Sequence, residues 1–582
     1  MWRRSGFRSP SSPFLTKNEM RFEKRLAKAL FVAAALTAAS CEDPSKGTGI
    51  ITGPVDPNPK PPVTEMKIPD YEDDYSAIAG WGDHNKWNLA NVHDPSIAYY
   101  DGYYYMYCTD ASYGNEHLKA TTGRHFPGKR SKDLVNWTYV PGPMNDAPAW
   151  VADSLNAIRK RMGVPAIEKN KISYGYWAPV VREVDGKLRM YYCIVVNNSI
   201  KTGGTSFDGS WTERAFIGMC ESTDPASGKW EDKGYVTCSS SDRGRDGWKR
   251  PNENNWDGYF YYNAIDPTYL VDDPSGKHYL IYGSWHSGFA LLEIDPESGK
   301  PVNAPLGNPW ADSVEDLTAR YGIRVGTRMA GSRWQGSEAP EIIYKDGYYY
   351  LFMAYDGLDV PYNTRVVRSD KIEGPYHDIT GRNFTNGRGD CYPIVTHPYR
   401  FNYSHGWVGI AHCCVFPERN GDSWFYSSQG RLPANVGGNA HSNAIMMGHV
   451  RRLVWCPASA DEPDNLWPIA LPERYAGIPD DPITKEELVG SWEHINLAYK
   501  YAEQQKSKEL VLKADGTMVG ALKGTWTFDA AKKWLTFDVD GKKTVVCVER
   551  EADWEATPRC ATIVYAGTEK SLNATWWGKK IQ

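Results

Sequence analysis

The chain has 582 residues and a formal net charge of −5, with 24% charged and 41% hydrophobic residues. This length predicts two or three separate parts, and the charge excludes the basic face that a nucleic-acid-binding protein needs. Aromatic residues reach 13%, an excess that favours β-structure or flat ligands on which aromatic rings stack.

Residues 1–41 predict an export signal rather than part of the fold. After Met20, which we interpret as the true start, a basic stretch leads into a short apolar run from Ala29 to Ala39. This run is too short to span a bilayer as a stable helix. Small residues precede Cys41, and "LTAASC" resembles a bacterial lipoprotein signal in which Cys41 carries the lipid. A plain signal peptide with an incidental cysteine is the alternative.

Residues 42–70 are rich in proline and polar side chains, which predicts a tether between the lipid and the fold. We therefore expect an exported lipoprotein at the cell surface or outer membrane, held by its lipid anchor, and a monomer. The cysteines after Cys41 fit neither a zinc site nor a dense disulfide scaffold. Export permits disulfides, but the sequence does not assign their pairing.

Five stretches of the chain repeat one pattern: a leading turn, an alternating strand, a turn with glycine, and a second aromatic strand. They begin at His93, Trp177, Ile265, Glu338 and Ala411. Four of the stretches carry a proline at the same place near their beginning, namely Pro95, Pro179, Pro267 and Pro340. The fifth has Cys413 at that place. Five hairpin units at this spacing predict an all-β fold, a five-bladed β-propeller over residues 71–480. A β-sandwich with similar hairpins is the alternative.

The innermost strands of a propeller converge on its axis, so the residues just before the shared position are brought close together. These residues are Asp94, Ala178, Asp266, Ala339 and His412, with Glu338 one step before Ala339. The pattern predicts three carboxylates and a histidine around an axial pocket. Two carboxylates across a cleft suit glycoside hydrolysis, because one donates a proton and the other activates water or attacks directly. A third carboxylate raises the pKa of the acid by like-charge repulsion.

The motifs "HDPS", "WAP", "NAIDP", "GSW" and "EAP" occur in this order and resemble glycoside hydrolase family 43, above all its endo-α-1,5-L-arabinanases. Residues 448–477 resemble the closing segment of the larger two-domain bacterial members. The resemblance implies that internal α-1,5 bonds of arabinan are hydrolysed with inversion. In that reaction Asp94 is the general base, Glu338 the general acid, and Asp266 tunes the pKa of the acid.

Inversion requires the base and acid carboxyls to lie about 6.5–9.5 Å apart, so that a water fits between them and the sugar. Glu341 is the rival for the role of acid. Because side chains alternate along a strand, Glu341 should point to the opposite face from Glu338, and we favour Glu338.

The resemblance also implies a metal ion and sugar contacts. His412, in "GIAHCCVF", matches the family's axial histidine, which holds calcium or a similar cation through one nitrogen and several waters. A buried, hydrogen-bonded histidine is the alternative. The expected substrate contacts are Asp94, Trp177, Phe207, Gly209, Asn263, Ser284, Trp285 and His286. The two tryptophans would stack on furanose rings, or else pack in the core.

Residues 481–582 change to short hairpins and predict a small antiparallel β-barrel. It resembles the accessory barrel of the two-domain arabinanases, and we expect it to pack on the propeller rather than bind polysaccharide. The expected partners are arabinan and arabino-oligosaccharides.

Other activities remain open on the same scaffold. One is an exo-acting α-L-arabinofuranosidase or β-xylosidase, which differs in having a blocked pocket instead of an open groove. Another is a non-catalytic arabinan-binding protein, which would not need to keep all three carboxylates. Five-bladed fructan-type enzymes fit poorly, because "NVHDPS" stands where they carry a Trp-Met-Asn-Asp-Pro motif.

Overall fold

The computed structural model describes residues 68–110, 124–161, 165–197, 214–240, 261–303, 313–330, 335–402, 404–419, 421–436 and 446–581. Three predicted site residues, Cys41, Phe207 and Gly209, lie outside these ranges. No helix within the described ranges is both long enough and apolar enough to cross a membrane. No disulfide joins the ten cysteines found there, and all of them except Cys560 are buried.

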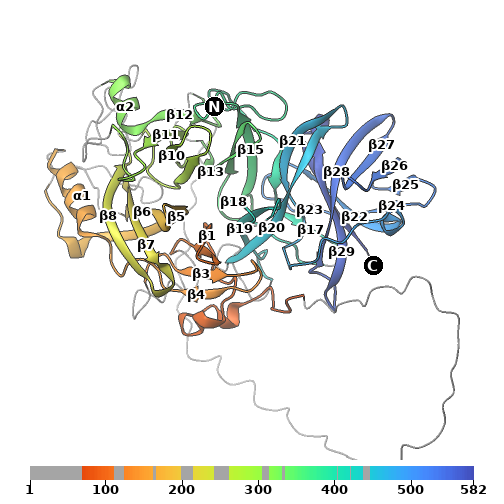
Figure 1. The fold of residues 1–582 in the computed structure, drawn as a ribbon, viewed down its shortest axis with the longest axis horizontal. Coiled ribbons are helices and arrows are strands. Elements are labelled where there is room, and N and C mark those ends of the chain that lie inside the picture. The colour runs from red at the N-terminus through yellow and green to blue at the C-terminus, as the bar shows by residue number, and fades with distance from the viewer. Residues whose placement is uncertain are drawn as a thin grey trace, which may run out of the picture. The chain divides into compact units, whose positions relative to one another are not determined.

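Five four-stranded antiparallel sheets follow one another along the chain, each with its strands side by side in sequence order (Figure 1). The first two sheets hold β1 (Ser96–Tyr100), β2 (Tyr103–Tyr107), β3 (Gly128–Ser131), β4 (Thr138–Val140), and then β5 (Ser173–Val184), β6 (Lys187–Asn197), β7 (Arg214–Asp224) and β8 (Lys229–Cys238). The third and fourth hold β9 (Thr268–Asp272), β10 (Lys277–Tyr282), β11 (Phe289–Ile294), β12 (Ile323–Gly326), and then β13 (Ser337–Lys345), β14 (Tyr348–Tyr355), β15 (Asn363–Ser369) and β16 (Ile394–Thr396). The fifth holds β18 (Cys414–Pro417), β19 (Trp424–Arg431), β20 (Met446–Ser459) and β21 (Glu462–Ala470).

Helices are short and lie between strands. The α-helices are α1 (Ala149–Arg161), α2 (Val314–Tyr321) and α3 (Lys485–Leu488). The 3₁₀ helices of the described ranges are Ser76–Ile78, Trp81–Lys86, Lys169–Lys171, Pro225–Ser227 and Lys570–Leu572.

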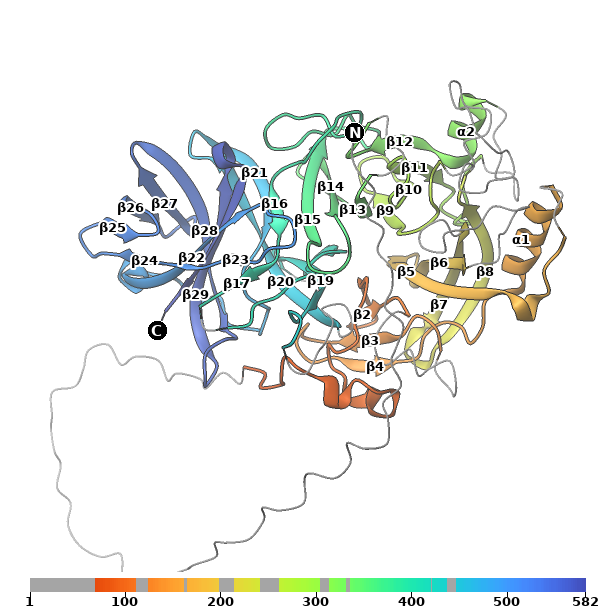
Figure 2. The same ribbon diagram turned by 180° about the vertical axis from the view of Figure 1, so that it is seen from behind.

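The five sheets are the blades of a propeller, because their first strands contact one another in a ring. β1 contacts β5, β5 contacts β9, β9 contacts β13, β13 contacts β18, and β18 contacts β1. Figures 1 and 2 show the blades in this order from opposite sides. The segment before β1 also pairs with the last blade, since the amide of Asn91 donates to the carbonyl of Met446 at 3.0 Å. The predicted five-bladed propeller is confirmed.

Two-residue turns join the first and second strands of three blades. The turns are Asp101-Gly102, Asp185-Gly186 and Asp346-Gly347, and both residues of each have positive φ, between 44° and 86°. This backbone matches the right-handed twist of paired strands, which is why Asp-Gly is a strong hairpin signal.

The repeated position on or just before each innermost strand carries an unusual backbone. Asp94, Ala178, Asp266, Ala339 and His412 have φ values of 52°, 39°, 55°, 55° and 54°. Positive φ in a residue other than glycine costs of order 1 kcal/mol or more, and such strain gathers at functional sites. The same strain at all five positions shows that they are structurally equivalent, as the sequence repeat predicts.

A closed barrel of eight strands follows the propeller. Its strands are β22 (Gly490–Ala498), β24 (Lys508–Leu512), β25 (Thr517–Gly520), β26 (Gly524–Asp529), β27 (Trp534–Val539), β28 (Lys542–Asp553), β29 (Cys560–Glu569) and β30 (Ala574–Lys580). Buried side chains such as Trp492, Phe537 and Tyr565 fill the interior in one hydrophobic cluster. The barrel is therefore a packed core, and the prediction of a small C-terminal barrel is confirmed.

The barrel packs against the last blade. β20 contacts β28 and β29, and β23 (Gln505–Lys506) pairs in parallel with β17 (Tyr399–Arg400). Trp577 of the barrel belongs to the same hydrophobic cluster as Tyr399 and Trp407, and the rings of Tyr399 and Trp577 lie 5.2 Å apart. Propeller and barrel therefore share part of one core.

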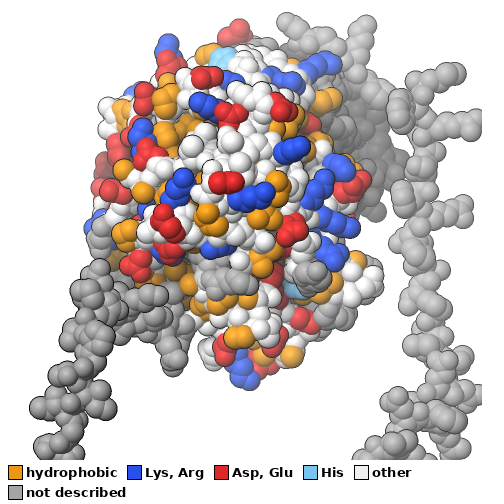
Figure 3. Space-filling model, turned by 90° about the vertical axis from the view of Figure 1, so that its right-hand side faces the viewer, with side chains coloured by type: hydrophobic (Ala, Val, Ile, Leu, Met, Phe, Trp, Pro, Cys, Tyr) orange, Lys and Arg blue, Asp and Glu red, His pale blue; other side chains and the backbone are white. Residues whose placement is uncertain are grey.

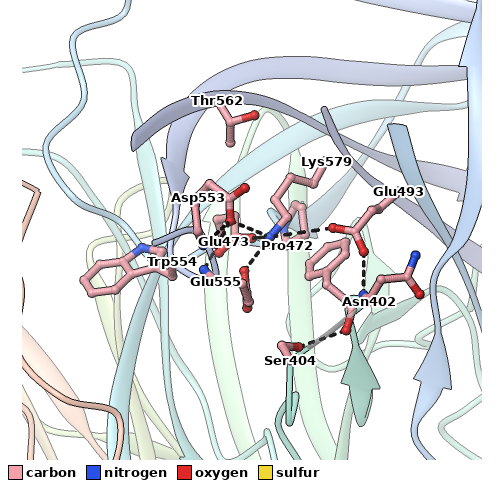
Figure 4. Close-up of polar contacts among 12 residues, drawn as sticks. Asn402, Ser404, Pro472, Glu473, Glu493, Asp553, Trp554, Glu555, Thr562 and Lys579 are labelled. Carbon is pink, nitrogen blue, oxygen red and sulfur yellow. Dashed lines mark hydrogen bonds and ion pairs between the residues drawn. The ribbon is translucent and has the colours of Figure 1, made fainter. Parts of the chain in front are cut away.

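A buried charge cluster lies beside this junction (Figure 4). The ammonium of Lys579 lies 2.7 Å from a carboxylate oxygen of Asp553, 2.5 Å from one of Glu555 and 3.1 Å from one of Glu473. Glu473 comes from the segment that joins β21 to α3, and the other three residues come from the barrel. The ammonium compensates part of the carboxylate charge, so we interpret the cluster as a clamp between the linking segment and the barrel.

Candidate active site

The four predicted site residues stand where innermost strands begin. Asp94 directly precedes the loop into β1, Asp266 lies two residues before β9, Glu338 is the second residue of β13, and His412 lies two residues before β18. The three carboxylates are only 6–8% exposed. Nδ1 of His412 lies 2.8 Å from Oδ1 of Asp94, and the amide of Ala339 donates to Oδ2 of Asp266 at 3.2 Å. The fold therefore brings these distant segments together at the propeller axis.

Asp94 is held as an ionised carboxylate. Its Oδ2 accepts a hydrogen bond from the hydroxyl of Thr109 at 2.7 Å, and its Oδ1 lies 3.2 Å from Nε2 of His93. Burial alone would raise the pKa of Asp94, but the imidazoles of His412 and His93 lower it well below its usual range. The amide of Asp94 donates to Oε1 of Gln429 at 2.8 Å, which fixes the backbone. Such a group can accept a proton from water.

Glu338 lies in a different environment. Its Oε2 accepts hydrogen bonds from the hydroxyl of Ser284 at 3.0 Å and from Nε1 of Trp285 at 2.6 Å. The hydroxyl of Tyr362 lies 2.6 Å from the other oxygen, Oε1. Burial raises the pKa of Glu338, and the negative charge of Asp94 raises it further, although the hydrogen-bond donors oppose this. A carboxyl with a raised pKa keeps its proton to higher pH and can serve as a general acid.

Asp266 and Glu338 influence each other. Burial raises the pKa of Asp266 to about 8, the charge of His412 opposes this, and the nearby Glu338 and Asp94 carboxylates add to it. Two buried carboxyls in such a pair titrate together, so their protons belong to the pair rather than to either residue. The pair therefore carries protons at a pH where isolated carboxyls have lost theirs, and the role of Asp266 stays a prediction.

The prediction that Glu341 points to the opposite face of the strand from Glu338 is wrong. On β13, two residues lie between Glu338 and Glu341. On β14, only one residue lies between their partners, Ala354 and Phe352. The extra residue on β13 forms a β-bulge. The extra residue puts both glutamates on the same face of the strand. What separates them is their position along β13 and their different partners.

Glu341 is fully engaged away from the other carboxylates. Its two oxygens lie 2.8 and 3.0 Å from the guanidinium of Arg182. It also accepts hydrogen bonds from the hydroxyl of Thr268 at 2.6 Å and the amide of Val415 at 3.1 Å. These partners belong to the second, third and fifth blades, so Glu341 joins four blades at the axis and is occupied structurally.

We expect Glu341→Gln to lower the melting temperature and leave the turnover of the folded protein little changed. Breaking a buried ion pair from one side costs about 3–5 kcal/mol, because Arg182 would keep its charge without its partner. Thermal unfolding together with kcat below the melting temperature checks this. A large loss of kcat in a protein that melts like the wild type would make Glu341 the acid.

The structure places the predicted sugar contacts in two groups. Ser284 and Trp285 lie at the acid, as described above. Asn263 is buried, and its Oδ1 accepts a hydrogen bond from the hydroxyl of Ser239 at 2.9 Å. His286 is also buried, whereas Trp177 is half-buried against the core of the second blade. Their roles as substrate contacts stay predictions, and Trp285 has a role that the sequence analysis missed, as a donor to Glu338.

Three further residues support the site and were missed. Thr109 follows β2, Tyr362 lies in the segment between β14 and β15, and Gln429 lies on β19. None of them stands at the repeated position before the innermost strand. Thr109 Oγ1 also accepts a hydrogen bond from the amide of Ala178, 2.5 Å away. Only the three-dimensional arrangement identifies them, because the sequence repeat marks none of their positions.

A cation at His412 is compatible with the surrounding residues. Nδ1 faces Asp94, which leaves Nε2 for a metal. No three His, Cys, Asp or Glu ligand atoms of the described ranges come together here, so an ion would take most of its ligands from water. Calcium prefers oxygen ligands, and the buried carboxylates Asp94, Asp266 and Glu338 supply negative charge around the pocket. Burial alone would lower the pKa of His412, but these carboxylates raise it to about 9, so a proton competes with any metal.

Curated proteins with similar sequences include two extracellular arabinanases. Among curated proteins, an extracellular endo-α-(1→5)-L-arabinanase of Thermotoga petrophila is 26% identical over 479 residues, covering 78% of this chain and 86% of its own. A second extracellular endo-α-(1→5)-L-arabinanase, from Bacillus subtilis, is 23% identical and covers 84% of this chain and 93% of its own.

Solved structures show the same fold. The crystal structure of an endo-1,5-α-L-arabinanase from Thermotoga petrophila has a TM-score of 0.61 at 22% identity, over 85% of this chain and 99% of that one. The family 43 YxiA protein of Bacillus licheniformis also has a TM-score of 0.61, at 23% identity over 84% and 98%.

Two family models match the sequence. Residues 472–578 match a C-terminal lipocalin-like domain, named GH43_C, which agrees with the observed barrel. Residues 89–444 match the model of glycosyl hydrolases family 43, more than half of the chain, and include Asp94, Asp266, Glu338 and His412. The resemblance seen in the motifs is thereby confirmed, and the chain belongs to glycosyl hydrolases family 43.

Proposed function

We propose that this protein hydrolyses internal α-1,5-L-arabinofuranosidic bonds of arabinan with inversion. The observation that supports this most is the contrast between two buried carboxyls at the propeller axis. Asp94 has a lowered pKa beside two imidazoles, whereas Glu338 has a raised pKa. Such a pair provides a base and an acid at the same pH. The relatives from Thermotoga petrophila and Bacillus subtilis are named for this substrate and this mode of cleavage.

In the proposed reaction, Asp94 takes a proton from a water molecule as the water oxygen bonds to the anomeric carbon. Glu338 gives its proton to the glycosidic oxygen, and the bond between that oxygen and the anomeric carbon breaks. The water attacks from the side opposite the leaving chain, so the configuration inverts. Asp94 ends protonated and Glu338 ionised, and exchange with solvent restores both.

The residues around Glu338 orient its carboxyl. Trp285 can only donate from its indole nitrogen, so Oε2 of Glu338 stays an acceptor. The hydroxyl of Tyr362 can either donate or accept, so the proton of the acid resides most readily on Oε1. Asp266 keeps the acid protonated through like-charge repulsion, without contacting the leaving oxygen.

We also propose that His412 holds a calcium ion or a similar cation through Nε2. When bound, such an ion supplies positive charge that polarises nearby water. The negative charge of the pocket supports this proposal, because the carboxyl groups of Asp94, Asp266 and Glu338 surround the imidazole of His412.

We expect Asp266→Asn to move the alkaline limb of the pH–activity profile to lower pH. Asp266, whose pKa is raised to about 8, is charged on the alkaline side of the profile. The neutral amide removes that like charge there, so Glu338 loses its proton more easily and activity falls earlier as the pH rises. The acidic limb, which follows protonation of Asp94, should move less. The measurement is kcat/KM on linear arabinan from pH 4 to 10. An unchanged alkaline limb would show that Asp266 does not set the pKa of the acid.

Chelation is expected to lower the hydrolysis of arabinan, and added calcium to restore it. His412→Ala should lower activity to a similar degree in a protein that still unfolds at a similar temperature, and calcium should not restore that variant. Rates that are unchanged in metal-free buffer would leave His412 as a hydrogen-bond partner of Asp94 and nothing more.

The substrate itself is tested by comparing linear α-1,5-arabinan with xylan and with aryl arabinofuranosides. Release of reducing ends from arabinan, and little from xylan, is expected. Hydrolysis of xylan alone would favour the β-xylosidase alternative. Binding of arabinan with no hydrolysis of any of these substrates would favour the non-catalytic binding protein.

We further propose that the protein is exported and anchored to the outer membrane through a lipid on Cys41. The support comes from the signal-like sequence before Cys41 and from relatives that are named extracellular. Labelling with a fatty-acid analogue tests this, since Cys41→Ser should abolish the label and release the protein from the membrane fraction.

A further inference from the structure

A cavity of about 810 Å³ lies at the end of the propeller axis away from Asp94 and Glu338. Its lining includes Tyr99 and Tyr100 at the end of β1 and Tyr344 near the end of β13. Tyr100 lies six residues after Asp94 at the far end of β1, a separation of at most about 20 Å along the strand. The cavity is therefore a different site from the catalytic pocket, and its size is typical of small-molecule and saccharide sites.

Aromatic side chains line part of the walls of this cavity. Tyr99, Tyr344 and Trp424 all line it and are half-buried. Within the described ranges, their hydroxyls and the indole nitrogen have no hydrogen-bond partner. A ring that is partly exposed with an unused polar tip can stack on an apolar ligand face and bond to a hydroxyl at the same time.

Two smaller hollows continue from the cavity across the last blade. Trp424 also lines a pocket of about 270 Å³, together with Trp455 and Trp534. Trp534 in turn lines a third pocket, of about 400 Å³, with Thr527 and Thr536 on the outer face of the barrel. Shared tryptophans therefore connect three hollows in series. We name this series the tryptophan track, defined by Trp424, Trp455 and Trp534.

The rings along the track are close together. The ring centroids of Trp424 and Trp455 lie 5.7 Å apart and edge to face. Trp534 carries the ammonium of Lys532 4.5 Å from its ring centroid. Because Trp424 belongs to β19 and Trp534 to β27, the track crosses from propeller to barrel. An occupant that fills it must be extended, since a single sugar would fill only one hollow.

The charges along the track are largely compensated. Arg182 is paired with Glu341, and Lys533 is paired with Asp480 and with Glu549, the latter at 2.9 Å. Figure 3 shows acidic and basic side chains interspersed with hydrophobic ones on the barrel side of the molecule. A surface of this kind offers aromatic faces and hydrogen-bonding groups, and its paired charges create little net electrostatic potential. It suits a neutral ligand rich in hydroxyls better than a nucleic acid or a charged peptide.

We propose that the tryptophan track is a second, non-catalytic binding site for an extended neutral polysaccharide, and that its ligand is the arabinan chain. The identity of the ligand rests on the proposed function. Furanose rings would stack on the tryptophans while their hydroxyls bond to the polar side chains between them. A polymer held on the track stays near the catalytic pocket, which raises its effective concentration there.

The test compares Trp424→Ala and Trp534→Ala with Tyr501→Ala, all in the full chain. Tyr501 is a matched control, because it is an aromatic residue of the barrel that is 65% exposed and lies off the track. The measurements are retardation by linear arabinan in affinity electrophoresis, KM and kcat on that polymer, and kcat/KM on a short arabino-oligosaccharide.

Each track variant should bind the polymer about 3- to 10-fold more weakly, in line with the loss of one stacking contact. KM on the polymer should rise, while kcat/KM on the short oligosaccharide stays unchanged, as it should for Tyr501→Ala on every substrate. Trp424→Phe should recover most of the binding, because it keeps an aromatic face. This recovery distinguishes stacking from a general loss of folding.

Wild-type retardation in both alanine variants would overturn the proposal, and so would an equal loss on polymer and short oligosaccharide. Track variants that change only the oligomeric state in gel filtration would mean that a second copy covers this face. Failure of the wild type to hydrolyse arabinan would contradict the proposed function instead, and stronger retardation by another neutral polysaccharide would then reassign the ligand of the track.

Discussion

Glu338→Gln is expected to lower kcat on linear arabinan on the order of 10³-fold while leaving binding of the polymer nearly intact. Glutamine keeps the size of the side chain and can still accept the hydrogen bonds from Ser284 and Trp285, which lie 3.0 and 2.6 Å from Oε2. It has no proton to give to the leaving oxygen. The loss should therefore appear in the chemical step and not in the affinity.

The nature of the leaving group provides the control for this prediction. An aryl arabinofuranoside with an acidic phenol needs little protonation as it departs, so Glu338→Gln should lose much less activity on it than on arabinan. Equal losses on both substrates would mean that Glu338 does something other than donate a proton. Turnover of arabinan like that of the wild type would exclude it from the reaction.

Asp94→Asn is expected to lower activity by a similar factor, of order 10²–10⁴, on both arabinan and the activated aryl substrate. Water must be activated whatever the leaving group, so a better leaving group cannot compensate for the missing base. Asparagine also replaces the negative charge beside His412, whose Nδ1 lies 2.8 Å from the carboxylate. The pKa of His412 should fall as a result, which NMR titration of the imidazole can detect.

The two variants together separate the acid from the base. Recovery of Glu338→Gln, but not of Asp94→Asn, on the activated substrate is the pattern that the assigned roles require. The reverse pattern would exchange the roles of the two residues. Thermal unfolding of Glu338→Gln should stay close to that of the wild type, because the replacement keeps the shape of the side chain. Asp94→Asn should melt at a lower temperature, because it removes the buried charge that faces His412.

Local sequence signals were sufficient to predict the propeller fold. An Asp-Gly turn between two alternating strands usually forms a tight hairpin. The structure has such hairpins at Asp101-Gly102, Asp185-Gly186 and Asp346-Gly347. A proline or Cys413 at one place in five such units marks one structural position. The residue just before that position has a positive φ in all five units. The sequence repeat was therefore enough to place Asp94, Asp266 and His412 together.

Contacts and irregularities outside the repeated pattern could not be predicted in the same way. Tyr362 reaches Glu338 from a segment without a repeat pattern, and Gln429 reaches Asp94 from 335 residues away. The bulge in β13 changed which face Glu341 occupies, and strand alternation cannot reveal a bulge. The ion pair of Glu341 with Arg182 likewise depends on two innermost strands that meet only when the ring closes.

The central claim is that the axial carboxylates of this chain cleave arabinan within the polymer. The most direct measurement is a time course of linear α-1,5-arabinan digestion by the purified chain from Glu42 onward, resolved by product length, with Glu338→Gln alongside. An early ladder of mixed oligomers from the wild type, and none from Glu338→Gln, is the predicted result. A single short product from the first time point would contradict endo cleavage and favour the exo-acting alternative. Equal ladders from both proteins would contradict the assignment of the acid.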